Sequence, residues 1–140
     1  MTAKQISVFI ENRKGRIGDV LDVLKSAGVN ILSLSIADTS EYGLFRIITD
    51  KPETGKIALS SAGFSAMLTD IFIIQLPHEP GSLHTILRVI SDEEISVEYM
   101  YGLSVAGEEA SIVLKTSDTD KAKTVFAKHD VKTLTDAELF

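Results

Sequence analysis

The 140-residue sequence has no cysteine and no tryptophan, and it contains only three prolines and three histidines. Without cysteine, disulfide bonds and thiolate metal sites are excluded, and three histidines without short ligand spacing favour no metal site. The longest apolar stretch, from Ile71 to Leu76, is interrupted by Gln75 and is far too short to cross a bilayer. The start of the sequence shows no apolar signal segment, so we expect no membrane partner and a cytoplasmic location.

Composition and charge narrow the function classes. The sequence is 44% hydrophobic and 24% charged, which is ordinary for a globular protein. Its net charge is −6 and its basic residues are scattered, which argues against a nucleic-acid partner. Ser65 lies in Gly-Phe-Ser-Ala-Met, which is not a nucleophile elbow, and there is no phosphate-binding loop. We therefore expect a protein that is not an enzyme and has no cofactor.

An internal repeat sets the domain organisation. At an offset of 66 residues, the apolar run Ile6–Ile10 aligns with Phe72–Leu76, and Gly15 aligns with Gly81. The offset becomes 67 after the turn near Asp38, where Phe45 meets Ile112. The sequence is therefore interpreted as a duplication, with domains at residues 1–69 and 70–140.

The hydrophobic periods follow the same order in each copy. In the first copy, residues 6–10, 32–36, 45–49 and 64–69 are expected to be strands, and the periods between them predict two helices. Gly28 and Gly63 are natural helix ends, and Pro52 suits a first helical turn. This order predicts an α+β fold of two ferredoxin-like βαββαβ modules, with antiparallel sheets and helices on one face.

The opposite face of each sheet is unusually apolar for a surface in contact with water. We therefore expect it to be covered by the other half or by another chain. Glu98 lies where the pattern predicts a helix-facing position, so either it sits at the sheet edge or the register shifts by one residue. The positions predicted to share the second face are Phe9, Ile31, Ser33, Ser35, Leu44, Ile48, Ile73, Gln75, Val97, Tyr99, Tyr101 and Val113.

The sequence resembles the ACT domain, a small-molecule-binding module, and specifically free-standing proteins with two ACT domains in one chain. The stretches Glu11–Ile17 and Gly28–Ile31 carry this resemblance in the first copy. In the second copy, Leu76–Leu83 is closer still to the Pro-Gly loop of the family. The junction around Gly63–Ser65 and the terminal Thr135–Leu139 are also similar.

The resemblance implies an amino acid bound at an interface between ACT modules, near the loops that contain Gly15 and Gly81. A helix start suits a carboxylate because it offers free N–H groups and the positive end of a dipole. Some family members have a histidine where this sequence has Ile10. The ligand-binding residues implied by position are Asn12, Lys14, Gly15, Arg16, Ile17 and Asn30, then His78, Pro80, Gly81, Ser82, Leu83 and Ser96.

Several alternatives stay open at this stage. Asn12 and Asn30 could only shape turns, His78 could be a solvated loop residue, and Lys14 and Arg16 could be solvated cations. The leading hypothesis is a regulatory sensor of amino acids that acts through a homodimer or through a partner such as a metabolic enzyme. The alternatives are an assembly subunit that binds no ligand, and a small enzyme on a ferredoxin-like scaffold.

Overall fold

The computed structural model of the protein describes residues 2–11, 14–38, 41–106 and 109–139. It divides into two compact units, one of Lys4–Thr69 and the other of Asp70–Phe140 with Met1–Ala3. Each unit is built in the order strand, helix, strand, strand, helix, strand. The predicted α+β fold of two ferredoxin-like βαββαβ modules is confirmed.

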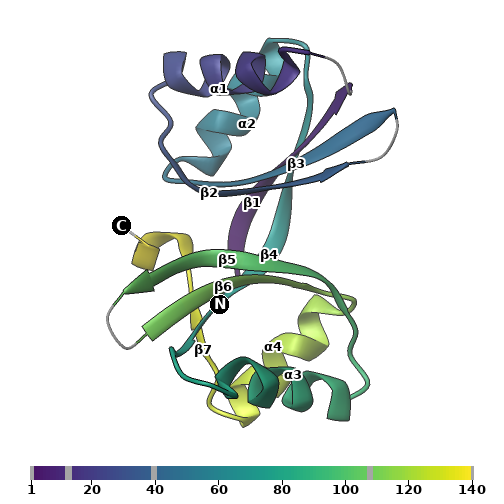
Figure 1. The fold of residues 1–140 in the computed structure, drawn as a ribbon, viewed down its shortest axis with the longest axis vertical. Coiled ribbons are helices and arrows are strands. Elements are labelled where there is room, and N and C mark those ends of the chain that lie inside the picture. The colour runs from purple at the N-terminus through teal and green to yellow at the C-terminus, as the bar shows by residue number, and fades with distance from the viewer. Residues whose placement is uncertain (1, 12–13, 39–40, 107–108, 140) are drawn as a thin grey trace. The chain divides into compact units, whose positions relative to one another are not determined.

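The first unit contains β1 (Ala3–Glu11), α1 (Arg16–Ser26), β2 (Ile31–Asp38), β3 (Tyr42–Thr49), α2 (Pro52–Ser61) and the first part of β4 (Ser65–Pro77). Its strands lie in the order β2-β3-β1-β4, and β3 pairs antiparallel with both β1 and β2. Both helices cover one face of this sheet (Figure 1). Buried Val20, Leu24 and Leu59 on the helices pack against Ile6 and Phe45 on the strands.

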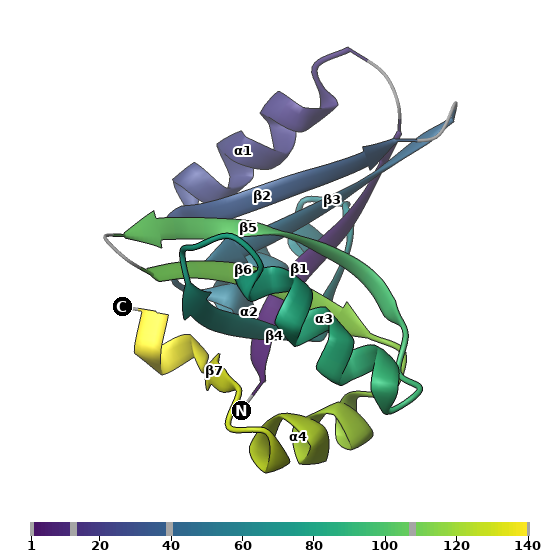
Figure 2. The same cartoon turned by 60° about the horizontal axis from the view of Figure 1, so that its bottom comes forward.

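The second unit begins within β4 and continues with α3 (Ser82–Asp92), β5 (Val97–Ala106), β6 (Glu109–Thr116), α4 (Thr119–Lys128), β7 (Lys132–Leu134) and the 3-10 helix η1 (Asp136–Leu139). Its strands lie in the order β7-β4-β6-β5, and the neighbours pair antiparallel. Helices α3 and α4 cover one face (Figures 1 and 2). The edge-to-face pair of Phe72 and Phe126, with centroids 4.9 Å apart, lies in the core.

Strand β4 is shared along the chain by the two units. The sequence predicts one strand ending at Thr69 and another starting after it, whereas β4 runs unbroken from Ser65 to Pro77. No glycine or proline interrupts the junction at Thr69 and Asp70. The boundary between the units therefore falls inside a strand rather than in a loop.

The four helices end in the same way. The second residue after each helix adopts a positive φ. It is Gly28 (72°) or Gly63 (93°) in the first unit and Glu94 (59°) or Asp130 (54°) in the second. The next amide then donates back to a carbonyl five residues earlier, as from Val29 to Leu24 and from Ile95 to Ile90. The predicted helix ends at Gly28 and Gly63 are confirmed.

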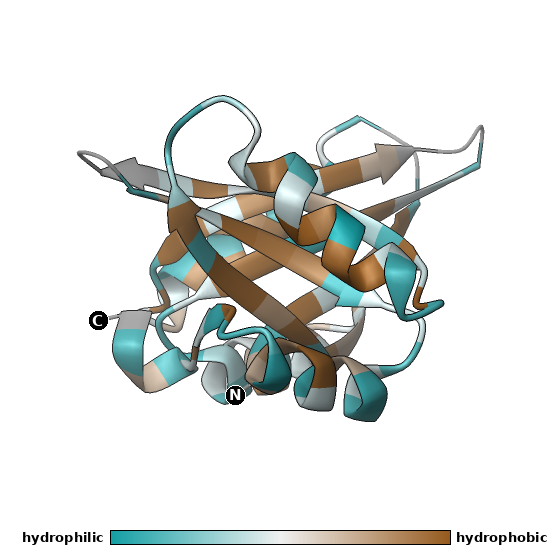
Figure 3. Ribbon diagram, turned by 90° about the horizontal axis from the view of Figure 1, so that it is seen from below, coloured by the Kyte–Doolittle hydropathy of each residue, from teal (hydrophilic) through white to brown (hydrophobic). Residues whose placement is uncertain are grey.

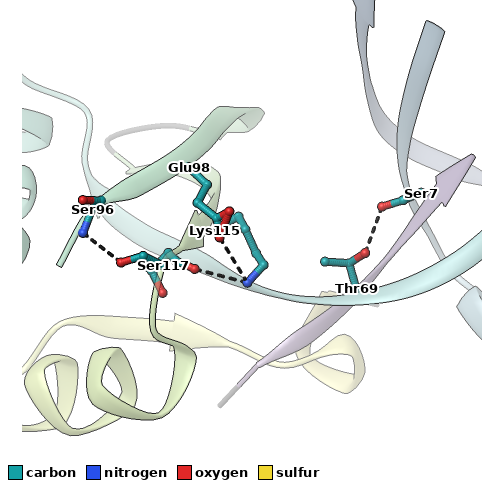
Figure 4. A network of polar contacts seen from close by, with 7 residues as sticks. Ser7, Thr69, Ser96, Glu98, Lys115 and Ser117 are labelled. Atoms are coloured by element: carbon teal, nitrogen blue, oxygen red, sulfur yellow. Dashed lines mark hydrogen bonds and ion pairs between the residues drawn. The ribbon is translucent and has the colours of Figure 1, made fainter. Parts of the chain in front are cut away.

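A β-bulge at the start of each edge strand corrects the predicted faces of two residues. The register shifts between Ile31 and Ser33 in β2, and between Val97 and Tyr99 in β5. Ile31 and Val97 consequently pack against the helix-side cores, although the alternation assigned them to the opposite face. Glu98 lies within the second bulge, exposed, with Oε1 3.8 Å from Lys115 Nζ (Figure 4). The register shift is therefore the correct explanation for Glu98.

The sheet faces away from the helices are only partly buried. Ile48, Ile73 and Val113 are buried there, whereas 51% of Phe9 is exposed in the single chain. Hydrophobic residues follow the strands of each unit, and hydrophilic residues gather in the loops (Figure 3). No helix in the described ranges is long and apolar enough to span a membrane.

The last turn of the chain is held by its own side chains. Glu138 Oε1 accepts hydrogen bonds from the Thr135 amide at 3.1 Å and from the Thr135 hydroxyl at 3.0 Å. The backbone hydrogen bond is the larger cause that lowers the pKa of Glu138 below its usual value, and the hydroxyl adds to it.

Candidate functional site

The two glycine loops have the same backbone conformation. Gly15 precedes α1 with φ 88° and ψ −9°, and Gly81 precedes α3 with φ 87° and ψ −11°. A Cβ atom at either position would meet nothing within 4 Å. Each glycine is therefore required by its left-handed conformation, and not by a close approach of another atom.

The helix starts that follow these loops offer unsatisfied backbone donors. In the described part of the chain, neither α1 nor α3 has a side-chain cap. The Ser82 amide donates to the Glu79 carbonyl at 3.3 Å, and the Thr85 amide donates to the Gly81 carbonyl at 3.0 Å. The next amides, at the second and third helical positions, have no acceptor within the helix, and an anion binds well at such a helix start.

Beside each helix start lies a crevice, in equivalent places of the two units. It is bounded by the end of the first strand, the start of the first helix and the start of the last strand. Its volume is about 240 Å³ in the first unit and about 460 Å³ in the second. In the first unit it is lined by Phe9, Ile10, Glu11, Arg16, Tyr42, Gly63, Phe64 and Ser65.

Two differences between the copies make the second crevice the larger one. Arg16 folds into the first crevice, with its guanidinium carbon 4.4 Å from the centroid of the Phe64 ring. Ser82 takes the equivalent position in the second unit, and Val131 stands where the first unit has Phe64. The short hydroxymethyl group and the smaller apolar side chain leave the second crevice open.

The open crevice of the second unit carries charged groups of both signs. Lys132 is the cation on its wall, beside the imidazole of His129, and Glu79 and Asp130 are the anions. His129 Nε2 lies 3.9 Å from Glu93 Oε1, an ion pair when the imidazole is protonated. The remaining lining residues are Gln75, Leu76, Pro77, Pro80, Gly81, Ser82, Thr85, Ile86 and Val131. A crevice with this lining suits a small zwitterion.

A second pocket of about 460 Å³ lies on the other side of the same loop. His78 and Leu83 line this pocket, which is bounded by the β5–β6 hairpin through Leu103 and Ile112. Glu79 and Ser82 line both pockets. The loop residues predicted in the second copy are thus brought together around two adjoining hollows.

Comparison with known families decides the identity of the fold. The sequence matches the ACT domain pair family over residues 1–140. The chain belongs to this family. No curated relative matches the sequence.

Solved structures with the same fold include both near and distant relatives. The protein BT0572 from Bacteroides thetaiotaomicron is 34% identical, with a TM-score of 0.93 over 99% of this chain and 96% of that one. The ligand-free regulatory subunit of aspartate kinase from Thermus thermophilus is 14% identical, with a TM-score of 0.64 over 89% of this chain and 88% of that one. The regulatory subunit from Thermus flavus is also 14% identical, with a TM-score of 0.59 over the same shares of the two chains.

Asn30 and Ser96 lie away from the glycine loop of their own ACT module. Each follows the C-terminal end of an 11-residue helix whose N-terminal end carries the loop, a span of about 16 Å at the usual helical rise. A ligand at a loop could therefore meet Asn30 or Ser96 only if another module supplied that residue. Asn30 instead lines a separate hollow of about 380 Å³ with Lys25 and Gly28.

The backbones of Asn30 and Ser96 have the same structural role in the two modules. The Asn30 amide donates to Asp50 Oδ1 at 2.8 Å, and the Ser96 amide donates to Ser117 Oγ at 3.1 Å (Figure 4). The amides of Asp50 and Ser117 donate back to the carbonyls of Asn30 and Ser96. These reciprocal pairs fasten the start of each edge strand to the end of its neighbour.

The other loop residues predicted in the first copy have different surroundings. Asn12 lies outside the described residues. Lys14 is exposed and Ile17 is 41% exposed, whereas Arg16 is packed into the crevice. The interpretation of Arg16 as a solvated cation is therefore wrong.

Sequence reasoning missed the wall of the crevice formed by Thr85, His129, Asp130 and Lys132. The signal was available in the topology. In a βαββαβ module the last strand lies beside the first, so the start of the last strand meets the end of the first. Thr85 also lies one turn into α3, and its hydroxyl donates to the Gly81 carbonyl at 3.1 Å.

Proposed function

We propose that this chain is a regulatory protein that binds a free amino acid in the open crevice of its second module. The observation that carries the proposal is the crevice itself, about 460 Å³ beside the uncapped start of α3. Its volume lies within the range of small-molecule sites. It also presents cationic and anionic side chains together, as recognition of a zwitterion requires.

The lining gives each end of an amino acid a partner. The carboxylate would lie toward the positive end of α3 at Ser82 and toward the Lys132 ammonium group, because both favour negative charge. The α-ammonium group would lie toward the carboxylates of Asp130 or Glu79. The apolar wall of Ile86 and Val131 would contact the side chain of the ligand.

The regulatory part of the proposal is supported by the family and by one distant relative. The Thermus thermophilus protein is by name the regulatory subunit of an aspartate kinase, which suggests an enzyme as a partner for this chain. The proposed role is ligand-dependent control of such a partner.

The test is a calorimetric and thermal-shift screen of the purified chain against the twenty standard L-amino acids. A ligand at 100 times its Kd is expected to raise the free energy of unfolding by about 2.7 kcal/mol. The Lys132→Met variant should weaken binding by about tenfold, or about 1.4 kcal/mol, because it removes a cation that faces the carboxylate.

Lys121→Met is the matched control, because Lys121 is an exposed lysine of α4 that does not line the crevice. It should leave the Kd unchanged. The absence of binding by any of the twenty amino acids would overturn the proposal, and equal losses in the two variants would move the site away from this crevice.

The second candidate function is an assembly subunit that pairs through its edge strands. Leu34 and Ile36 of β2 are 46% and 44% exposed. Both lie on the helix side of the sheet, because they pair with Ile47 and Phe45. A homodimer that covers them would be detected by light scattering, and Leu34→Lys should return it to a monomer.

A further inference from the structure

We propose that Arg16 closes the crevice of the first module from within, so that the chain takes up ligand in its second module alone. This inference rests on the proposed function, since it assigns the site to one of two equivalent crevices. The two modules have matched backbones at the loops before their crevices. The glycine φ angles before the crevices differ by only one degree, 88° against 87°.

The contacts of Arg16 are those of a packed side chain. Its guanidinium carbon lies 4.4 Å from the centroid of the Phe64 ring, within the range of a cation–π contact. Only 22% of the side chain is exposed, and Nη1 lies 3.4 Å from Asp19 Oδ2. Phe64 is itself 8% exposed and belongs to the core of the module. The guanidinium group is thus held between a core ring and a carboxylate of its own helix.

The position of this cation is not explained by helix stability. A positive charge at the start of a helix opposes the helix dipole, and Arg16 is the first residue of α1. Its Nε is buried without a hydrogen-bond partner, which also costs free energy. The favourable contributions that remain are the contacts of the guanidinium group with the Phe64 ring and with Asp19, and these hold the side chain in the crevice.

The second module lacks both halves of this arrangement. Ser82 is too short to reach across the crevice, and Val131 offers no ring for a cation to stack on. The volume is about 460 Å³ in the second module and about 240 Å³ in the first. The chain therefore presents a larger crevice in its second module and, in its first, a smaller crevice whose wall includes the packed Arg16 side chain.

A rival role for Arg16 makes the opposite prediction. An arginine beside a helix start could be the receptor for a ligand carboxylate, in which case its removal would abolish binding in the first module. If Arg16 instead acts as a plug, meaning a side chain that keeps ligand out of the first crevice, its removal opens the first module to ligand. The two roles are separated by where binding appears in the Arg16→Ser variant.

The experiment is a residue-resolved NMR titration of the full chain with a pooled mixture of the twenty standard L-amino acids. The amides of Gly15 and Gly81 report on the two modules. In the wild type we expect only the Gly81 signal to shift. In the Arg16→Ser variant we expect both signals to shift, and in the Ser82→Arg variant we expect neither to shift. The double variant Ser82→Arg, Val131→Phe rebuilds the plug with its ring and should also abolish the Gly81 shift.

Arg88→Ser and Ser91→Arg are the matched controls. Both positions are exposed on α3 and line neither crevice, so both variants should behave as the wild type. A ligand-dependent shift of the Gly15 signal in the wild type would contradict the proposal that Arg16 keeps ligand out of the first crevice. An Arg16→Ser variant that is folded and shows no shift at Gly15 would overturn it as well.

A readout without ligand keeps this inference separate from the proposed function. The Arg16 Nε–H signal should be shifted upfield by the Phe64 ring and should exchange slowly, and Phe64→Leu should remove both effects. If no amino acid shifts Gly81 in the wild type, the proposed amino-acid site is wrong. The Arg16 signal then decides whether the crevice is plugged, and a rapidly exchanging, unshifted signal would overturn the plug.

Discussion

The two modules have the same backbone plan and reach it with different residues. Where the first module has Arg16, Gly28, Gly55 and Gly63, the second has Ser82, Glu94, Ala122 and Asp130. The equivalent loops, helix ends and strand-fastening hydrogen bonds are retained in both modules. This difference indicates that the backbone geometry has been kept after the duplication while the chemistry of the crevice has diverged.

The comparison also separates two uses of glycine. Gly15 and Gly81 are alike in both modules because a φ near 88° is needed before each first helix. At the helix ends, glycine is present only in the first module, although the second adopts the same left-handed conformation. Positive φ is therefore kept in both copies, while the residue that bears it is free to change where a cost of about 1 kcal/mol can be tolerated.

The largest expected effect tests the equivalence of the loops. Gly15→Val and Gly81→Val should each lower the free energy of unfolding by about 2–3 kcal/mol, because a β-branched residue is strained at this φ. The equality of the two losses is the prediction, since the φ angles match and neither Cβ would meet another atom within 4 Å. Urea unfolding of the two variants measures it, and a difference above about 1 kcal/mol would break the comparison.

The next effect tests how closely the helices pack on the sheets. A Cβ atom on Gly55 would lie 2.7 Å from Ile6 Cδ1 and 3.2 Å from Leu24 Cδ2. Gly55→Ala should therefore destabilise the chain by about 1–2 kcal/mol through overpacking, although alanine is the better helix former.

The matched variant is Ala122→Gly in the second module, where the same position is a fully buried alanine. It should also destabilise the chain, by about 1 kcal/mol, because it loses helix propensity and a packed methyl group. If either variant is more stable than the wild type in urea, the two changes act in opposite directions. The helix–sheet interfaces of the two modules are then not specialised for glycine and alanine as described.

The sequence predicted most of the fold because the repeat supplied each expectation twice. Glycines mark the loops and helix ends because these positions need a left-handed backbone. The apolar periods located both helices of each copy. The bulges were beyond the pattern, since one inserted residue leaves no compositional mark. Ile31 and Val97 therefore changed face without warning.

The candidate site was less predictable than the fold. The loop around Gly81 was found from its Pro-Gly sequence, but the opposite wall comes from residues almost fifty positions later in the chain, around His129–Lys132. The sequence left Arg16 open between a ligand contact and a solvated cation, because its packing on Phe64 depends on residues that are distant in the chain. Residues that act through tertiary neighbours leave a weaker trace in the sequence than residues that shape a turn.

The smallest expected effect concerns the helix end at Glu94, and it would make the second module more like the first. Glu94 adopts φ 59° after α3, a conformation that costs a residue with a Cβ atom roughly 1–2 kcal/mol relative to glycine. Part of this gain is offset because glycine has more freedom in the unfolded chain. Glu94→Gly should therefore stabilise the chain by about 0.5–1 kcal/mol, and Gly28→Ala at the equivalent position should destabilise it by a similar amount.

Asp130→Gly should stabilise the chain by less, since aspartate tolerates this conformation better than glutamate. Because Asp130 lines the crevice and Glu94 does not, only the Asp130 variant should also alter amino-acid affinity. Urea unfolding with a parallel binding titration measures both properties, and a stabilised Glu94→Gly variant with unchanged affinity would show that helix-end strain and ligand recognition are separate features of the second module.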